Sequence, residues 1–112
     1  MQDRDYVFVS RMLDFSKRIV RRTAGISIND FLENNDLQDM ILYAIGQVGE
    51  NANAVSDTIR DAYPDMLWNA VIGIRNRVFH SYGDIDMTIV FEAVIGHIPL
   101  LIQQLEEILA KG

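Results

Sequence analysis

Large apolar residues recur in steps of three and four along most of this chain, and this spacing constrains the fold more than any other feature. Such a repeat places the apolar side chains on one face of an α-helix. No segment shows the sustained period-two alternation that is typical of β-strands. The sequence therefore predicts an all-α fold. The predicted apolar stripes are Phe8, Met12, Phe15 and Ile19; Leu37, Ile41, Ala44, Val48, Ala52, Val55 and Ile59; Trp68, Val71, Ile72, Val78 and Phe79; and Ile89 or Val90, followed by Val94, Ile98, Leu101, Leu105 and Ile108.

Turn and capping signals predict where the first helices begin and end. Gly25 can close the first helix in a left-handed conformation. The segment 27–30 resembles a capping box, which predicts a short helix that carries Phe31 and Leu32 inward. A long second helix is expected over residues 35–62. Its interior Gly46 and Gly49 each cost about 1 kcal/mol relative to alanine, which favours close approach of another backbone there.

Two prolines shape the second half of the predicted fold. Pro64 stops the long helix and suits the first turn of a third helix, which is expected to end near residues 82–83. Asp84 or Asp86 caps a fourth helical region, and Pro99 should kink or split it. We expect an up-and-down bundle of four main helices, or five if one is broken, in a single domain over residues 1–112.

Composition narrows the class of protein. The chain has no cysteine, which excludes a disulfide framework and a cysteine nucleophile. The early charged residues and the lack of a long apolar run argue against a signal peptide and a membrane helix, so we expect a cytoplasmic protein with no membrane partner. The formal net charge of −6 argues against unspecific coating by nucleic acid.

The charge is unevenly distributed along the chain. Residues 1–22 hold six basic side chains and three acidic ones, whereas residues 23–60 hold one basic and six acidic side chains. One interpretation is that the two segments pack as neighbouring helices with complementary solvated faces. The alternative is a local basic groove.

The segment 75–82 contains the residues best suited to chemistry. Phosphate-binding glycine loops, HExxH metal pairs and GxSxG nucleophile elbows are missing from the sequence. His97 lies in apolar surroundings and is interpreted as structural. Asn76 and His80, four residues apart, should be neighbours on a helix, and Arg75 and Tyr82, seven apart, should share a face.

Arg75 and His80 do not share that face. They lie about 140° apart on an ideal helix, so they converge only through the length of the arginine, fraying of the helix end, or a second copy of the helix. A purely structural interpretation stays open for the whole segment. In it Arg75 and Arg77 pair with surface acids, Asn76 caps a neighbouring turn, and Tyr82 packs its ring.

The pattern Arg75-Asn76-x3-His80-x-Tyr82 resembles the RN-x3-H-x-Y signature of the HepT-like branch of the HEPN superfamily. Two further segments support the resemblance. Residues 44–52 resemble the IGEA-type helix of this branch, and residues 63–76 resemble its yP-x-x-W-x-x-iig-x-RN stretch. Ser81 and Gly83 depart from the glycine and the aromatic residue that are common at these positions.

The resemblance implies a dimerising HEPN-like bundle that is a metal-independent endoribonuclease without a cofactor. The two RN-x3-H motifs would face each other across the dimer cleft and act on RNA. It also implies the toxin of a toxin–antitoxin pair, whose antitoxin is a minimal nucleotidyltransferase that silences the enzyme by adenylylation of Tyr82.

The residue types are consistent with that activity. Imidazole titrates near neutrality, so two copies of His80 could supply the base and the acid of RNA cleavage. Arg75 would neutralise the phosphate, Asn76 would orient His80 or the phosphate, and Arg77 would border the groove. Two other functions stay open: a non-catalytic module that uses this face to hold a nucleotidyltransferase, and a nucleotide-binding protein in which Arg75 grips a phosphate.

Overall fold

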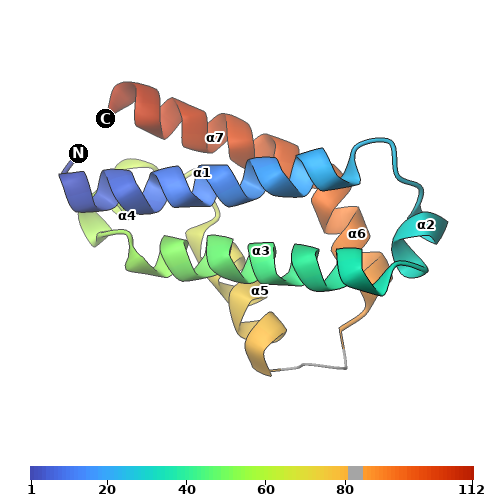
Figure 1. The fold of residues 1–112 in the computed structure, drawn as a ribbon. Helices are drawn as coiled ribbons and strands as arrows, with labels where there is room; N and C mark the ends of the chain where they lie inside the picture. Colours follow the sequence, from blue (N-terminus) through green and yellow to red (C-terminus); the bar gives the residue numbers. More distant parts are fainter. Residues whose placement is uncertain (81–84) are drawn as a thin grey trace.

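A computed structural model describes residues 1–80 and 85–112, and these residues form helices and connecting turns without a strand (Figure 1). The all-α prediction is confirmed. The helices are α1 (Asp3–Thr23), α2 (Ile28–Leu32), α3 (Asn35–Ala54), α4 (Asp57–Ala62), α5 (Trp68–His80), α6 (Met87–Gly96) and α7 (Ile98–Lys111).

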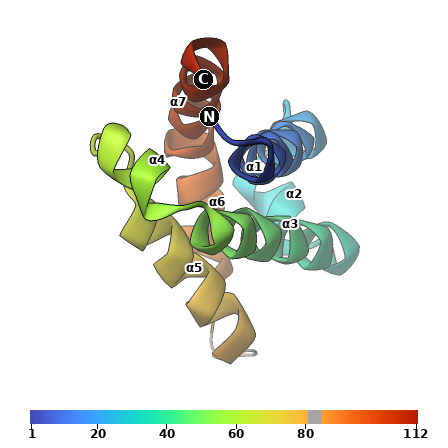
Figure 2. The same cartoon turned by 90° about the vertical axis from the view of Figure 1, so that its left-hand side faces the viewer.

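Helix α3 lies at the centre of the bundle. It packs against α1 on one side and against α5 on the other, and α7 packs along α1 (Figure 2). Helices α1, α3 and α7 run roughly along one another, whereas α5 crosses α3 obliquely (Figure 1). This arrangement carries α5, the helix with the RN motif, away from α1.

The predicted apolar stripes form most of the core. Met12 and Ile19 of α1 are fully buried, and the α3 stripe from Ile41 to Ala52 is buried against them. Phe31 is also fully buried and packs against Phe91 with the ring centroids 5.2 Å apart. The prediction for Leu32 is wrong, because this side chain is 41% exposed. Helix α2 has a single turn, and a residue next to Phe31 is rotated by about 100° away from the core.

The long second helix predicted over residues 35–62 is interrupted at Val55 and Ser56. The cause lies on α1, where the buried Asp5 accepts hydrogen bonds from the backbone N–H of Ser56 at 2.9 Å and from its hydroxyl at 2.7 Å. Arg60 then donates to the carbonyl oxygens of Ala52, Asn53 and Val55, which closes the end of α3. Side chains therefore satisfy the backbone groups that the break exposes.

Pro64 is not part of a helix, so the prediction that it opens the third helix is wrong. The carbonyl oxygen of Tyr63 accepts from the backbone N–H of Met66 at 3.2 Å and from the indole N–H of Trp68 at 3.1 Å. The resulting turn buries Met66 and Trp68, and α5 begins only at Trp68.

The predictions at Gly25, Ser27, Asp86 and Pro99 are confirmed. The predicted end of the third helix near residues 82–83 and the alternative cap Asp84 lie outside the described residues. Gly25 has a φ of 73°, and the hydroxyl of Ser27 accepts from the backbone N–H of Asp30 at 3.1 Å. Asp86 caps α6 through the backbone N–H of Thr88, and α6 and α7 meet at a 46° bend beside Pro99.

No helix in the described part of the chain has by itself the length and hydropathy of a membrane span. Only α6 and α7, taken together across their bend, reach those values.

Candidate active site

The position of the RN motif is set by a backbone contact between α3 and α5 at Gly49. A Cβ atom on Gly49 would overlap the Cβ of Arg75 and would lie 2.9 Å from the carbonyl oxygen of Val71. Only glycine leaves the space that this crossing needs. The predicted close approach of a second backbone is therefore confirmed at Gly49, and it places Arg75 directly on α3.

Glu50 and Asn76 are acceptors for the guanidinium of Arg75 within the described part of the chain. Its Nη2 forms an ion pair with Oε2 of Glu50 on α3 at 2.6 Å, and its Nη1 donates to Oδ1 of Asn76 at 2.9 Å. The Arg75 side chain is 29% exposed, so these contacts are only partly screened by water. The pairing with an acid that the structural interpretation predicts for Arg75 is confirmed, and the paired cation still reaches the surface.

The structure places the other predicted site residues in different surroundings. Asn76 is exposed and contacts Arg75, so the structure brings these two predicted residues together. Arg77 is exposed on another side of α5 and lines a cavity of about 480 Å³ with apolar residues of α3, α5, α6 and α7. His80 is the last residue of α5, and its side chain lies outside the description. Tyr82 lies outside the described residues.

Glu50 is the site residue that sequence reasoning missed. It lies within the segment 44–52 that resembles the family helix, yet the sequence alone gives it no role. One signal could have found it: Glu50 directly follows Gly49, so an arginine on a helix packed at that glycine comes within its reach. In the described parts of the chain, no group of three or more histidine or acidic side chains is arranged to hold a metal ion.

Comparison with known proteins identifies the family. The family model for HepT-like ribonucleases matches residues 12–108, which include α5 and the RN motif. This chain belongs to the HepT-like ribonuclease family. Its all-α bundle agrees with the HEPN-like fold that the resemblance predicts.

Proteins that carry ribonuclease names resemble this chain over most of their length. The provisionally named RNase MJ1380 of Methanocaldococcus jannaschii is 24% identical over 107 residues, which cover 95% of this chain and 98% of that protein. The provisionally named RNase TTE0752 of Caldanaerobacter subterraneus subsp. tengcongensis is 25% identical, with 93% of each chain covered. The provisionally named ribonuclease HepT of Thermococcus cleftensis is 23% identical over 77% of this chain and 78% of its own. No solved structure shows a significant match.

Proposed function

We propose that this HepT-like chain is a metal-independent endoribonuclease and the toxin of a toxin–antitoxin pair. The observation that carries the proposal is the complete RN-x3-H-x-Y motif within a chain that matches the HepT-like ribonuclease family. The docking of Arg75 at Gly49 supports it, because a fixed guanidinium at the surface is suited to a phosphate.

The proposed reaction is an internal transesterification of RNA. One His80 removes the proton of a ribose 2′-hydroxyl, and the 2′-oxygen attacks the adjacent phosphorus. The bond to the 5′-oxygen breaks, and a second His80 protonates this leaving oxygen. The products are a 2′,3′-cyclic phosphate and a free 5′-hydroxyl. Arg75 stabilises the charge on the non-bridging oxygens, while Asn76 holds the guanidinium in place.

The mechanism requires two copies of the chain, because each motif contains one histidine. An apolar cavity of about 480 Å³ adjoins α5 and is lined by Ile74 and Ile89, which are 39% and 60% exposed. Arg77 of the motif helix lies on its rim. A second copy covering this surface would bury the apolar side chains and bring the two motif helices together.

We therefore expect a two-fold symmetric homodimer. Light scattering at micromolar concentration should give twice the mass of the chain. Ile89→Asp should shift the equilibrium toward the monomer, because it places a charge in the apolar interface. Ribonuclease activity should fall in proportion to the loss of dimer. An active protein that is strictly monomeric would contradict the two-histidine mechanism.

Regulation is proposed to act at Tyr82. The phenol oxygen attacks the α-phosphorus of ATP bound to the antitoxin, pyrophosphate leaves, and the phenol loses its proton. The attached nucleotide brings an anionic phosphate close to the motif, where it would compete with RNA for Arg75.

Incubation with the antitoxin and ATP should add whole adenylate increments to the peptide that holds Tyr82, as mass spectrometry would show. Tyr82→Phe should gain no mass and should stay toxic beside the antitoxin, because it lacks the attacking oxygen. Tyr63→Phe, which removes the hydroxyl of a tyrosine outside the motif, is the matched control and should be modified like the wild type. Neutralisation of Tyr82→Phe as efficient as that of the wild type would mean that the antitoxin inhibits by binding alone.

The experiment that tests the proposed function is RNA cleavage by purified chain, without antitoxin, in the presence of EDTA. A non-catalytic module that only holds a nucleotidyltransferase would leave the RNA intact. A nucleotide-binding protein would also leave it intact and would release heat with adenine nucleotides in calorimetry.

A further inference from the structure

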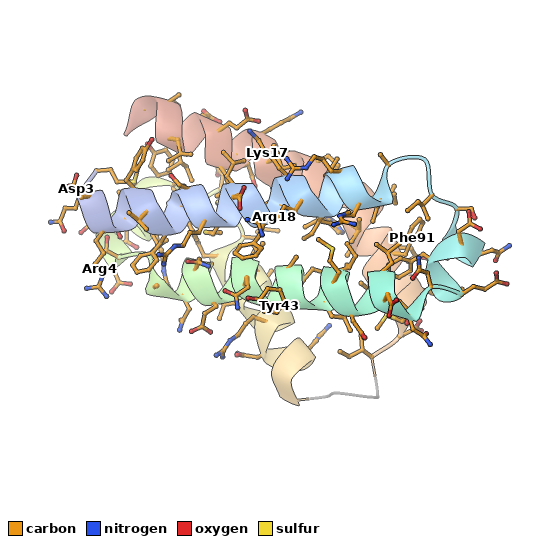
Figure 3. The ribbon with its side chains drawn as sticks, viewed as in Figure 1. Asp3, Arg4, Lys17, Arg18, Tyr43 and Phe91 are labelled. Atoms are coloured by element: carbon orange, nitrogen blue, oxygen red, sulfur yellow. The ribbon has the colours of Figure 1, made fainter. Side chains whose placement is uncertain are left out.

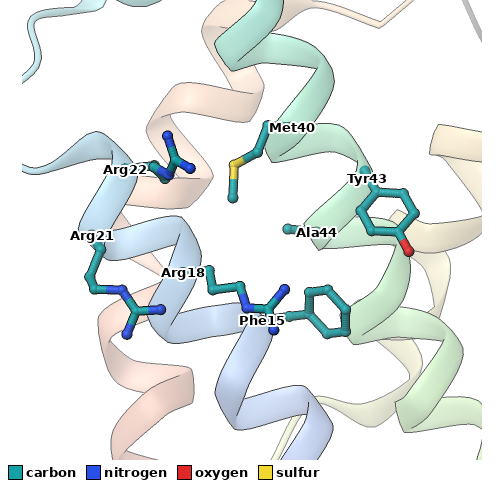
Figure 4. Close-up of a pocket in the computed structure, with 7 residues that line it drawn as sticks. All are labelled: Phe15, Arg18, Arg21, Arg22, Met40, Tyr43 and Ala44. Carbon is teal, nitrogen blue, oxygen red and sulfur yellow. The ribbon is translucent and has the colours of Figure 1, made fainter.

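A groove of basic and aromatic residues runs along the surface between α1 and α3. Its first part is a cavity of about 470 Å³, and Figure 4 shows three arginines of α1 on one side and residues of α3 on the other. No acidic side chain lines this part. The lining residues are Phe15, Arg18, Arg21, Arg22, Met40, Tyr43 and Ala44.

The groove continues toward the RN motif. A second cavity of about 470 Å³ shares Phe15 and Arg18 with the first and extends to Glu50. Its charged lining is mixed, with Arg11 and Arg18 beside Asp14 and Glu50, so the excess positive charge of the groove lies in the first cavity. On α3, Tyr43 and Glu50 are seven residues apart and therefore lie on one face of the helix. Glu50 is the residue whose carboxylate holds Arg75. The far end of the groove thus lies beside the ion-pair partner of the motif arginine.

Its positive charge is not neutralised by α3. The packing of α1 beside α3 agrees with the sequence-based expectation of neighbouring helices, yet none of the ion pairs among residues 1–80 joins these two helices. Arg18 pairs with Asp14 of its own helix at 2.7 Å. Arg21 and Arg22 are exposed and form no ion pair with any described residue, so two cations of the first cavity face water.

Aromatic rings lie among these cations. The guanidinium of Arg18 lies 4.9 Å from the centroid of the Phe15 ring, and the Phe15 and Tyr43 rings meet edge to face at 6.1 Å. Tyr43 is 59% exposed, and Figure 3 places it on the outer surface of α3. Its ring is therefore available to a further stacking partner.

We propose that this groove binds single-stranded RNA and leads it to Arg75, an inference that rests on the proposed ribonuclease function. Arg21 and Arg22 contact phosphates, and Tyr43 stacks on an unpaired base. Cations beside an exposed aromatic ring are typical of surfaces that bind single strands, whereas an acidic protein partner would need only the cations. From Arg11 to Arg22 the α1 side of the groove extends about 16 Å, which is long enough for several nucleotides.

The test compares arginines that line the groove with a matched cation that does not. Lys17 is exposed on the same helix, lines neither cavity, and lies on a different side of α1 from Arg18, about 100° around the helix (Figure 3). Binding of a fluorescent single-stranded RNA is measured by anisotropy in a His80→Ala background, so that the RNA is not consumed. Arg21 and Arg22 are exposed, so their substitution should leave thermal melting unchanged. Tyr43→Ala also loses the ring contact with Phe15, so its melting temperature is measured beside its Kd, and Tyr43→Phe serves as the variant that keeps this contact.

Arg21→Gln and Arg22→Gln should each raise the Kd about fivefold and flatten the dependence of log K on log salt by roughly 0.7, because each removes one phosphate contact. Tyr43→Ala should raise the Kd at least about fivefold, and Tyr43→Phe should restore binding, because stacking needs the ring and not the hydroxyl. The Kd of Lys17→Gln should stay within about twofold of that of the His80→Ala parent.

The outcomes separate this inference from the proposed function. If the unaltered chain cleaves RNA while Arg21→Gln, Arg22→Gln and Tyr43→Ala all bind it as Lys17→Gln does, the groove is not the RNA path and the ribonuclease function stands. If the groove variants lose RNA binding but the unaltered chain cleaves nothing, the groove assignment stands and the proposed catalysis fails. If the groove variants lose binding of the antitoxin but keep binding of RNA, the groove is a protein interface and the groove assignment is overturned.

Discussion

His80→Ala should lower the rate of RNA cleavage by about a thousandfold or more, and the wild-type rate should be the same with and without EDTA. The variant removes both the base and the acid from the composite site, and each such group contributes roughly 10²- to 10⁴-fold. The measurement is initial-rate cleavage of a labelled RNA, with identification of 2′,3′-cyclic phosphate ends. Arg75→Gln should also be nearly inactive, because it removes the charge that stabilises the transition state.

The chain offers a matched control for the histidine. His97 is exposed between α6 and α7, and nothing assigns it to the RN motif. His97→Ala should therefore cleave RNA at the wild-type rate. Undiminished cleavage by His80→Ala, or cleavage that EDTA removes, would show that the RN motif is not the metal-independent centre proposed here.

Gly49→Ala should lower the free energy of unfolding by about 2 kcal/mol and slow RNA cleavage by about a hundredfold. The added methyl group meets the Cβ of Arg75 and the carbonyl oxygen of Val71, which are rigid atoms that move only with α5. A displacement of about 1 Å at a catalytic group can cost this much in rate. Urea denaturation measures the stability, and the same RNA assay measures the activity.

Gly73→Ala is the control, because it adds the same methyl group to the motif helix where no described atom lies within 4 Å of it, apart from its chain neighbours and the nearby backbone of its own helix. It should raise the free energy of unfolding by about 0.5 to 1 kcal/mol through helix propensity and leave activity unchanged. Equal activity and equal stability of Gly49→Ala and Gly73→Ala would mean that the crossing of α3 and α5 does not position Arg75.

The sequence was sufficient to predict the features that depend on local chemistry. Helical periodicity predicted the all-α bundle, Gly25 and Ser27 predicted the first turn, and Pro99 predicted the bend between α6 and α7. Gly49 could be predicted as a contact because an interior glycine is costly in a helix unless something packs there. The RN motif could be found because its residues lie close together in the chain.

Features that depend on distant residues could not be predicted. The break between α3 and α4 requires Asp5, which lies 51 positions before Ser56 and on a different helix. The pairing of Arg75 with Glu50 requires the crossing of α5 over α3, which no periodicity encodes. The exposure of Leu32 could not be predicted either. The single turn of α2, and not the apolar character of Leu32, decides which side chain reaches the core.

The ion pair between Arg75 and Glu50 gives the site a way to distinguish a polymer from its monomers. A free phosphate or mononucleotide must displace a carboxylate oxygen that lies 2.6 Å from the guanidinium. The concentration at which it competes with Glu50 is its concentration in bulk solution. A strand already held by the arginines of the groove presents its next phosphate at an effective concentration in the millimolar range or above. Competition from Glu50 would then suppress occupancy by phosphates whose bulk concentration lies below this value more than occupancy by RNA held in the groove.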